Sequence, residues 1–267
     1  MARRLSLLSF LGLLIALPPP GFAAEKTVKE GVAAQGLVRE IIDGDTLILE
    51  SGDAVRLVGV QAPKLSLGRP RVTDQPLAAA AKRALAEMAL GKKMRLRFFG
   101  RRHDRHGRLL AHLFVVDGDK GEWVQGRLLA QGLARVYSFA DNRARVAEML
   151  ALERAARAQK RGIWAHPFYQ VIDVQKAGER LDRFELVEGR VRKAAVVKGR
   201  GYLNFGDDWR EDFTIVLAPK VRRAFEREGI DISAYAGKRV RVRGWITRYN
   251  GPMIEATHPE QIERLSD

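Results

Sequence analysis

Apolar and polar residues alternate along the first part of the chain in the way that short β-strands require. The segment 36–60 (GLVREIIDGDTLILESGDAVRLVGV) predicts three strands separated by the turns DGDT and ESGD. Segments 92–99 and 108–116 alternate in the same way and predict two more strands. Together these patterns predict five strands before residue 117.

Helical spacing follows and interrupts these strands. Segment 76–90 is rich in Ala and Leu, has Pro76 at its start and is followed by Gly91, which is typical of a helix with marked ends. Segments 122–132 and 143–160 predict two further helices. Strands first and helices later predict an α+β, mostly β fold, namely an OB-type five-stranded barrel with helices packed on it.

The pattern starts again at Phe184. Three strand-like segments, a helical segment beginning at Pro219 and two more strand-like segments follow in order. This is the order of elements in a small OB-like barrel. We therefore predict a linker at 25–35, a first domain at 36–165, a connector at 166–183 and a second domain at 184–267.

Residues 1–24 have a different character from the two predicted domains. The basic start MARR precedes the apolar run Leu5–Leu17, and the segment PPPGFAA then ends in small residues. This is the pattern of a secretory signal peptide, and the apolar run is too short to cross a bilayer comfortably. We expect cleavage after Ala23 or Ala24, a periplasmic or secreted protein, and no membrane span once the signal is removed.

The composition of the chain excludes some kinds of site and favours some kinds of ligand. The 267-residue chain has no cysteine, which excludes disulfides, zinc–thiolate sites and a cysteine nucleophile. It is a basic protein with a formal net charge of +15, and most of the excess lies before residue 171. Such an excess favours polyanions such as nucleic acid, anionic lipid headgroups or acidic polysaccharide, although a solvated basic surface stays an alternative.

Five segments of the first predicted domain carry a recognisable set of motifs. They are IIDGDTLIL (41–49), VRLVGVQAP (55–63), HDRHGRLLAHLF (103–114), QGLARVY (131–137) and KRGIW (160–164). In order and spacing they resemble the staphylococcal nuclease (thermonuclease) family. The resemblance implies a barrel with packed helices and Ca²⁺-dependent cleavage of phosphodiester bonds in DNA and RNA. The second predicted domain resembles bacterial OB-fold domains less specifically.

The resemblance also implies roles for four residues. Asp45 corresponds to a direct Ca²⁺ ligand of the family, and Asp43 would lie close behind it. Arg56 and Arg108 correspond to the arginines that hold the phosphate and stabilise the charge that develops on its oxygens.

The chain departs from the family where the family typically has the motif D-T-P-E. Here the sequence is QAPK, so that Gln61 replaces a metal-binding carboxylate and Lys64 replaces the carboxylate regarded as the general base. Calcium requires six to eight oxygen ligands, several of them anionic, and the loss of a general base costs about 10²–10⁴ in rate. We therefore expect impaired or lost Ca²⁺-dependent hydrolysis, with Lys64 as a further cation for the nucleic acid.

Other interpretations stay open at this point. The protein could be an active endonuclease cleaving DNA and RNA, either with Lys64 itself as the base in a metal-free mechanism or with a metal ligand relocated to Asp43, Asp74 or Asp104. In the second case Ca²⁺ would be its cofactor. Otherwise we expect no cofactor. It could instead be an envelope scaffold or a protein-interaction module, for which the sequence identifies no protein partner.

Two aromatic residues of the second predicted domain are candidates for nucleic-acid contacts. Tyr202 and Trp209 fall where the second and third strands of an OB-like barrel form a binding face on which bases stack. Trp209 could equally fill the barrel. The near balance of charge in this part of the chain leaves both interpretations open.

Overall fold

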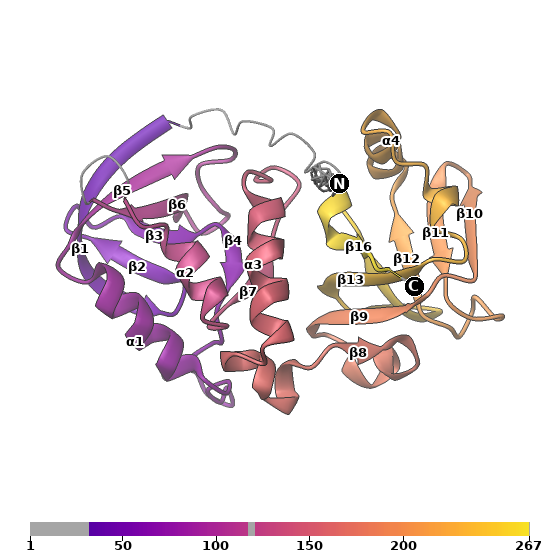
Figure 1. The fold of residues 1–267 in the computed structure, drawn as a ribbon, viewed down its shortest axis with the longest axis horizontal. Helices are drawn as coiled ribbons and strands as arrows, with labels where there is room; N and C mark the ends of the chain where they lie inside the picture. The colour runs from indigo at the N-terminus through magenta and orange to yellow at the C-terminus, as the bar shows by residue number, and fades with distance from the viewer. Residues whose placement is uncertain (1–31, 117–120, 267) are drawn as a thin grey trace, which may run out of the picture.

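The computed structural model describes residues 32–116 and 121–266 of the chain. They form two lobes, and helix α3 (Val146–Ala158) of the first lobe faces the strands of the second (Figure 1). The predicted signal peptide lies outside the described residues. No helix within the described ranges combines the length and the apolar character needed to cross a bilayer.

The first lobe contains a closed five-stranded barrel, which confirms the predicted fold class. Its strands follow the order β1-β2-β3-β6-β5, and every neighbouring pair is antiparallel except β3 and β6, which run parallel. Their bounds are β1 Val32–Asp43, β2 Thr46–Leu49, β3 Ala54–Leu57, β5 Lys93–Phe98 and β6 Leu109–Val115.

One boundary of the first lobe differs from the expectation. We expected a linker as far as residue 35, but β1 begins at Val32 and pairs with β5 from Val32 opposite Phe98 to Leu37 opposite Lys93. Ala33, Ala34 and Gln35 are exposed, which fits a strand end that is held by backbone pairing with β5 and does not depend on buried apolar side chains.

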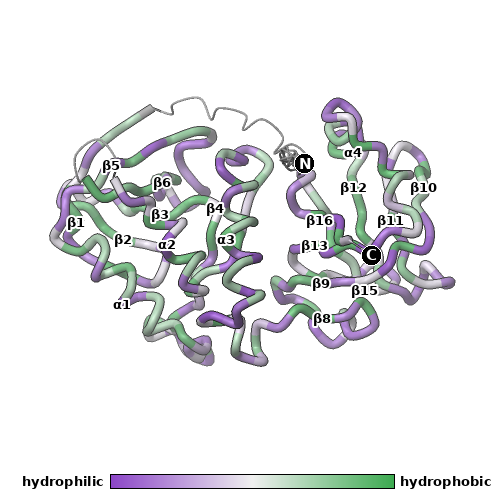
Figure 2. The backbone as a smooth tube through the Cα atoms, in the orientation of Figure 1, coloured by the Kyte–Doolittle hydropathy of each residue, from purple (hydrophilic) through white to green (hydrophobic). Residues whose placement is uncertain are grey.

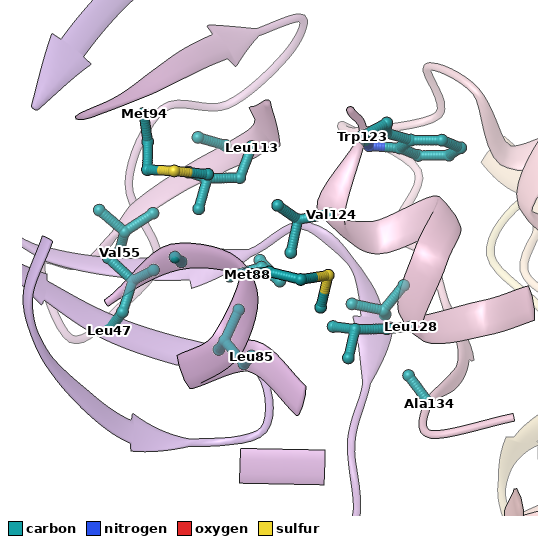
Figure 3. Packing of buried hydrophobic residues seen from close by; sticks show 14 of the residues in the cluster. Leu47, Val55, Leu85, Met88, Met94, Leu113, Trp123, Val124, Leu128 and Ala134 are labelled. Carbon is teal, nitrogen blue, oxygen red and sulfur yellow. The ribbon is translucent and has the colours of Figure 1, made fainter. Parts of the chain in front are cut away.

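Three helices pack on the barrel close to the positions that the sequence predicts. They are α1 (Ala78–Ala89), α2 (Val124–Ala130) and α3. Leu85 of α1 and Leu128 of α2 lie in one buried cluster with the barrel residues Leu47 and Val55 (Figure 3). Beside the barrel, β4 (Gly59–Gln61) pairs with β7 (Arg135–Tyr137), a small sheet that the sequence pattern did not predict.

The second lobe consists of two sheets around one core, in the orders β10-β11-β12-β15-β14 and β16-β13-β9-β8. The strands are β8 Ile172–Asp173, β9 Phe184–Arg190, β10 Lys193–Val197, β11 Arg200–Asn204, β12 Thr214–Leu217, β13 Arg239–Trp245, β14 Thr247–Tyr249, β15 Gly251–Glu255 and β16 Ile262–Arg264. Helix α4 (Pro219–Arg227) lies between β12 and β13 in the chain.

The order of elements in the second lobe agrees with the predicted one, with two differences. Short interruptions divide the first and fourth predicted strands into β9 and β10 and into β13 and β14, so that each predicted strand contributes to both sheets. The predicted connector contains β8, which pairs with β9, and the 3-10 helix Val174–Arg180. The exact domain boundaries therefore stay a prediction.

A buried ion pair network joins the two lobes. Arg243 of β13 is 1% exposed, and its guanidinium lies 2.9 Å and 3.0 Å from the two oxygens of Glu153 on α3. The same guanidinium donates to Glu263 of β16 at 2.6 Å. Figure 2 shows apolar stretches along the strands of both lobes, whereas this junction is both buried and charged.

Candidate functional site

The turn between β1 and β2 places two carboxylates next to each other. Asp43 and Asp45 flank Gly44, and the backbone N–H of Asp45 donates to Asp43 Oδ1 at 3.0 Å. A Cβ at Gly44 would lie 2.6 Å from the Cβ of Ala81 on α1 and 2.7 Å from that of Ala62. Glycine is therefore required here, because helix α1 and the segment after β4 both press on the turn.

Lys64 lies against these carboxylates. Its Nζ donates to the two carboxylate oxygens of Asp45 at 2.7 Å and 2.8 Å and to Asp43 Oδ2 at 3.2 Å. The backbone N–H of Lys64 donates to Gln75 Oε1 at 2.9 Å, which fixes the loop from which the side chain extends. The sequence analysis assigned Lys64 to nucleic acid, whereas in the structure its ammonium is bonded to two acids of its own chain.

Arg56 of β3 holds the other side of Asp45. Its Nη1 lies 3.2 Å from Asp45 Oδ1, and its guanidinium donates to the carbonyl oxygens of Leu57 at 2.9 Å and Val60 at 2.7 Å. The side chain is almost completely buried, and the backbone hydrogen bonds fix its orientation. Arg56 of β3 is therefore a fixed cation that forms an ion pair with Asp45 of the acidic turn.

Asp45 stays ionised because its charged form has several partners. Complete burial by itself would raise the pKa of Asp45, but the charges of Arg56 and Lys64 and the hydrogen bonds from Lys64 and the Ala62 N–H together lower it to about 2. Two acids and two basic residues thus form a compact cluster, which we call the acid–cation cluster: Asp43, Asp45, Arg56 and Lys64.

Gln61, the other replaced position, has a separate partner. Its Oε1 accepts a hydrogen bond from Arg135 Nε of β7 at 3.0 Å. The amide oxygen of Gln61 therefore supports the pairing of β4 with β7. Arg135 also lies over the ring of Phe184, at 4.6 Å from its centroid, and so connects this position to the second lobe.

The donor set of the acid–cation cluster does not fit a calcium ion. Two carboxylates are present, but the space between them is occupied by an ammonium at hydrogen-bonding distance from both. Within residues 32–116 and 121–266, no three His, Cys, Asp or Glu side chains converge in a way that could hold a metal. Of the three relocated ligands considered above, Asp43 belongs to the cluster itself and is bonded to Lys64, whereas Asp74 accepts from the Ser66 N–H and Asp104 accepts from Arg108.

A pocket of about 490 Å³ opens beside this cluster. Arg56 and Arg108 both line it, so the structure brings together the two arginines that the sequence analysis assigned to phosphate. Arg108 is about one-third exposed and pairs with Asp104 at 2.7 Å, which holds its guanidinium at the rim. The pocket can hold an anion near Arg108, with Arg56 behind it.

The pocket also contains basic and aromatic residues that the sequence analysis did not select as candidates. Among them are Arg101, Arg105, Tyr137, Phe139 and Trp245. Arg105 and Tyr137 were noted only as parts of the family segments 103–114 and 131–137. No sequence signal indicated Trp245, because it belongs to the second lobe and reaches the pocket only through the packing of the two lobes.

The candidates of the second lobe also come together. Tyr202 and Trp209 line a separate groove of about 410 Å³ with Lys193, Asp207 and Tyr249. Trp209 is 54% exposed and therefore does not fill the barrel core. Whether this groove binds nucleic acid stays a prediction.

Comparison with known proteins gives the family of the first lobe. Residues 54–166 match the family described as staphylococcal nuclease homologue. The endonuclease YncB of Bacillus subtilis is 35% identical over 133 residues, which cover 48% of this chain and 60% of YncB. The thermonuclease of Staphylococcus intermedius is 28% identical over 131 residues, or 48% of this chain and 74% of that protein.

A third relative, protein ParB of Escherichia coli, is 32% identical over 149 residues, which cover 50% of this chain and 73% of ParB. The chain spans less than two thirds of the length of YncB, and the matches account for about half of the chain itself. The barrel, the order of its motifs and these matches agree, and the chain belongs to the staphylococcal nuclease homologue family.

Proposed function

We propose that the protein binds the phosphodiester backbone of DNA or RNA and that its Ca²⁺-dependent hydrolysis is impaired or lost. The observation that carries this proposal is the position of Lys64 Nζ, within 3.2 Å of both Asp43 and Asp45. An ammonium in this position neutralises the carboxylates that a divalent ion would need. It also occupies the space in which that ion would lie.

The geometry disfavours calcium for two reasons. A divalent ion would have to displace Lys64, which would then be left near Arg56 with neither of its carboxylate partners. The remaining donors would be two carboxylates and neutral oxygens, fewer anions than a tight calcium site uses. Without the metal and without a carboxylate at position 64, the cluster lacks the two groups that the family resemblance implies for activating water.

The pocket nevertheless keeps what phosphate binding requires. Four arginines line it (Arg56, Arg101, Arg105 and Arg108) against two aspartates, Asp104 and Asp141. Guanidinium groups bind phosphate through charge and paired hydrogen bonds, and the basic excess of the chain attracts a polyanion from a distance. The names of the relatives YncB and thermonuclease point to the same class of ligand.

The test is to separate binding from cleavage in the purified protein. A labelled oligonucleotide should bind equally well in Ca²⁺ and in EDTA, and its affinity should fall steeply with salt. Under the same conditions, plasmid and RNA should remain uncut over times in which a thermonuclease digests them completely.

Arg108→Ala should weaken this binding, whereas Arg239→Ala, which removes an exposed arginine of the second lobe, should weaken it much less. Rapid cleavage that requires Ca²⁺ would overturn the loss of hydrolysis. Absence of oligonucleotide binding at low salt would overturn the proposed ligand.

We also propose that the protein acts after export, on the basis of the signal-like pattern at residues 1–24. N-terminal sequencing of the protein recovered from a periplasmic or culture fraction should begin after Ala23 or Ala24. A mature protein that starts at Met1 and remains in the cytoplasmic fraction would contradict this.

A further inference from the structure

The pocket beside the acid–cation cluster is built by both lobes. Arg56 and Arg108 come from the first barrel, whereas Trp245 comes from the last residue of β13 in the second lobe. A ligand that fills this pocket therefore contacts the second lobe as well, and the nuclease-like lobe alone does not complete it.

The lining of the pocket also includes aromatic side chains that are partly exposed. Trp245 is 49% exposed and Phe139 is 47% exposed, which is unusual for side chains of this size. Tyr137 lies between them: its ring packs edge-on against Phe139 with centroids 4.9 Å apart, and its Oη accepts a hydrogen bond from Trp245 Nε1 at 3.1 Å. Polar and ring contacts thus fix the edges of these side chains, while large parts of Trp245 and Phe139 stay open to solvent.

The position of Trp245 is secured by the junction between the lobes. Two residues earlier on the same strand, Arg243 is buried between Glu153 and Glu263. The ring of Trp245 also packs against the ring of Phe184, with centroids 6.4 Å apart. A side chain with such anchors is a preformed platform, and binding to it does not require ordering a loop.

We propose that this composite pocket binds single-stranded nucleic acid, with the phosphate at Arg108 and an unpaired base stacked on Trp245. This rests on the proposed function and adds to it the form of the ligand and a role for the second lobe. Paired bases are enclosed within a duplex, whereas a single strand offers its bases to an aromatic ring while its backbone follows the cations. Arginines and exposed aromatic rings in one pocket suit that combination.

The experiment compares three labelled probes in EDTA at one salt concentration: a short single-stranded DNA, an abasic strand with the same number of phosphates, and a duplex of the same sequence. Wild-type protein should bind the base-bearing single strand most tightly. Trp245→Ala should weaken that binding about 5- to 100-fold, the range expected for loss of one base–aromatic stack, and leave the abasic strand almost unaffected. Trp245→Phe should retain most of the affinity.

Leu90→Ala is the matched control, because Leu90 is similarly exposed (48%) and lies outside the pocket. Its affinity for all three probes should equal that of the wild type. If Trp245→Ala does not fold, the readout is the quenching of tryptophan fluorescence by the base-bearing strand. This quenching should be largely lost in Trp245→Phe and absent with the abasic strand.

The possible failures are distinguishable. Equal affinity of the wild type for the base-bearing and abasic strands, or an equal loss for both in Trp245→Ala, overturns the stacking role and leaves phosphate binding intact. Tighter binding of the duplex than of the single strand also overturns it. Failure of the wild type to bind any probe overturns the proposed function together with this inference.

Discussion

The two lobes share one pattern of strand pairing but place different side chains in it. In the first, β3 runs parallel to β6, and helix α1 follows the third barrel strand. In the second, β12 runs parallel to β15, and helix α4 follows β12. The first lobe closes into a single barrel, whereas interruptions near residues 191 and 246 divide the second into two sheets.

The difference lies at the first tight turn. In the first lobe this turn carries Asp43 and Asp45, and β3, which pairs with β2, provides Arg56 opposite Thr46. In the second lobe the corresponding turn is Lys198–Gly199, and the facing residues of β11 and β12 include the buried pair Leu203 and Ile215. Both lobes have an apolar interior, but the turn of the first lobe also carries the acid–cation cluster, whereas the turn at Lys198–Gly199 has no carboxylate. The fold alone therefore does not determine the site.

The largest expected effect comes from replacing the amide and the ammonium at positions 61 and 64, beside and within the acid–cation cluster, with carboxylates. Gln61→Asp with Lys64→Glu would remove the ammonium between Asp43 and Asp45 and provide two more carboxylates. We expect calcium binding to appear by calorimetry and the rate of plasmid cleavage to rise about 10²–10⁴-fold, the contribution of a general base.

Lys93→Glu tests whether added negative charge by itself has this effect, since Lys93 is exposed on β5. It should produce neither calcium binding nor cleavage. Calcium binding without cleavage in the double variant would mean that the arginines proposed to bind phosphate are not positioned for catalysis, and absence of both would mean that the carboxylates alone do not form the site.

The next largest effect concerns the buried ion pairs between the lobes, which Arg243 forms with Glu153. Arg243→Ala would leave Glu153, which is completely buried, with only Arg157 as a charged partner. Breaking a buried ion pair from one side typically costs about 3–5 kcal/mol of unfolding free energy, which urea denaturation measures. We also expect two unfolding transitions in place of one, because the lobes would be less strongly coupled.

Arg239→Ala on the same strand provides the comparison. Arg239 is about half exposed and pairs with Glu188, so its loss should cost less than about 1 kcal/mol. Similar losses for the two variants would contradict the view that the junction depends on buried charge.

A smaller effect follows from the ionised state of Asp45. Its pKa lies near 2 in the folded protein and near 3.8 in the unfolded chain, so the unfolded state binds the proton more readily. The resulting stability, about 2 kcal/mol, is fully present above about pH 4 and is lost as the pH falls towards 2.

Asp45→Asn should be less stable than the wild type at neutral pH and should show a flatter pH dependence between about pH 4 and 2. The measurement is the free energy of unfolding in urea at several pH values. The turn at Lys198–Gly199 has no carboxyl group and contributes nothing to this difference. Parallel pH profiles for the two proteins would contradict the assigned ionisation.

Much of the first lobe followed from the sequence because its signals are local. Alternation gave the barrel strands, Pro76 and Gly91 bracketed α1, and DGDT marked the turn that carries Asp43 and Asp45. The sequence showed the replacements Gln61 and Lys64, but it did not show which residues they contact. That Lys64 bonds to Asp45 and Gln61 to Arg135 depends on loop geometry, which no pattern of residues encodes.

The composite pocket is the clearest example of what the sequence did not reveal. Trp245 follows a strand pattern like any other, and its importance comes from the docking of β13 against α3 through Arg243 and Glu153. An alternating segment predicts which side chains share a face of a sheet, but it does not predict which other lobe that face will meet.

The smallest expected effect tests whether the second lobe binds nucleic acid by itself. Its groove has the exposed ring of Trp209, with Tyr202 nearby, but Lys193 is offset there by Asp207, so phosphate attraction is weak. We expect Trp209→Ala with Tyr202→Ala to weaken single-strand binding by up to about fivefold, the lower limit for one stacked base, as measured with the same labelled strand. A loss larger than that of Trp245→Ala would reverse the comparison. The groove of the second lobe, in place of the composite pocket, would then be the main nucleic-acid site of the molecule.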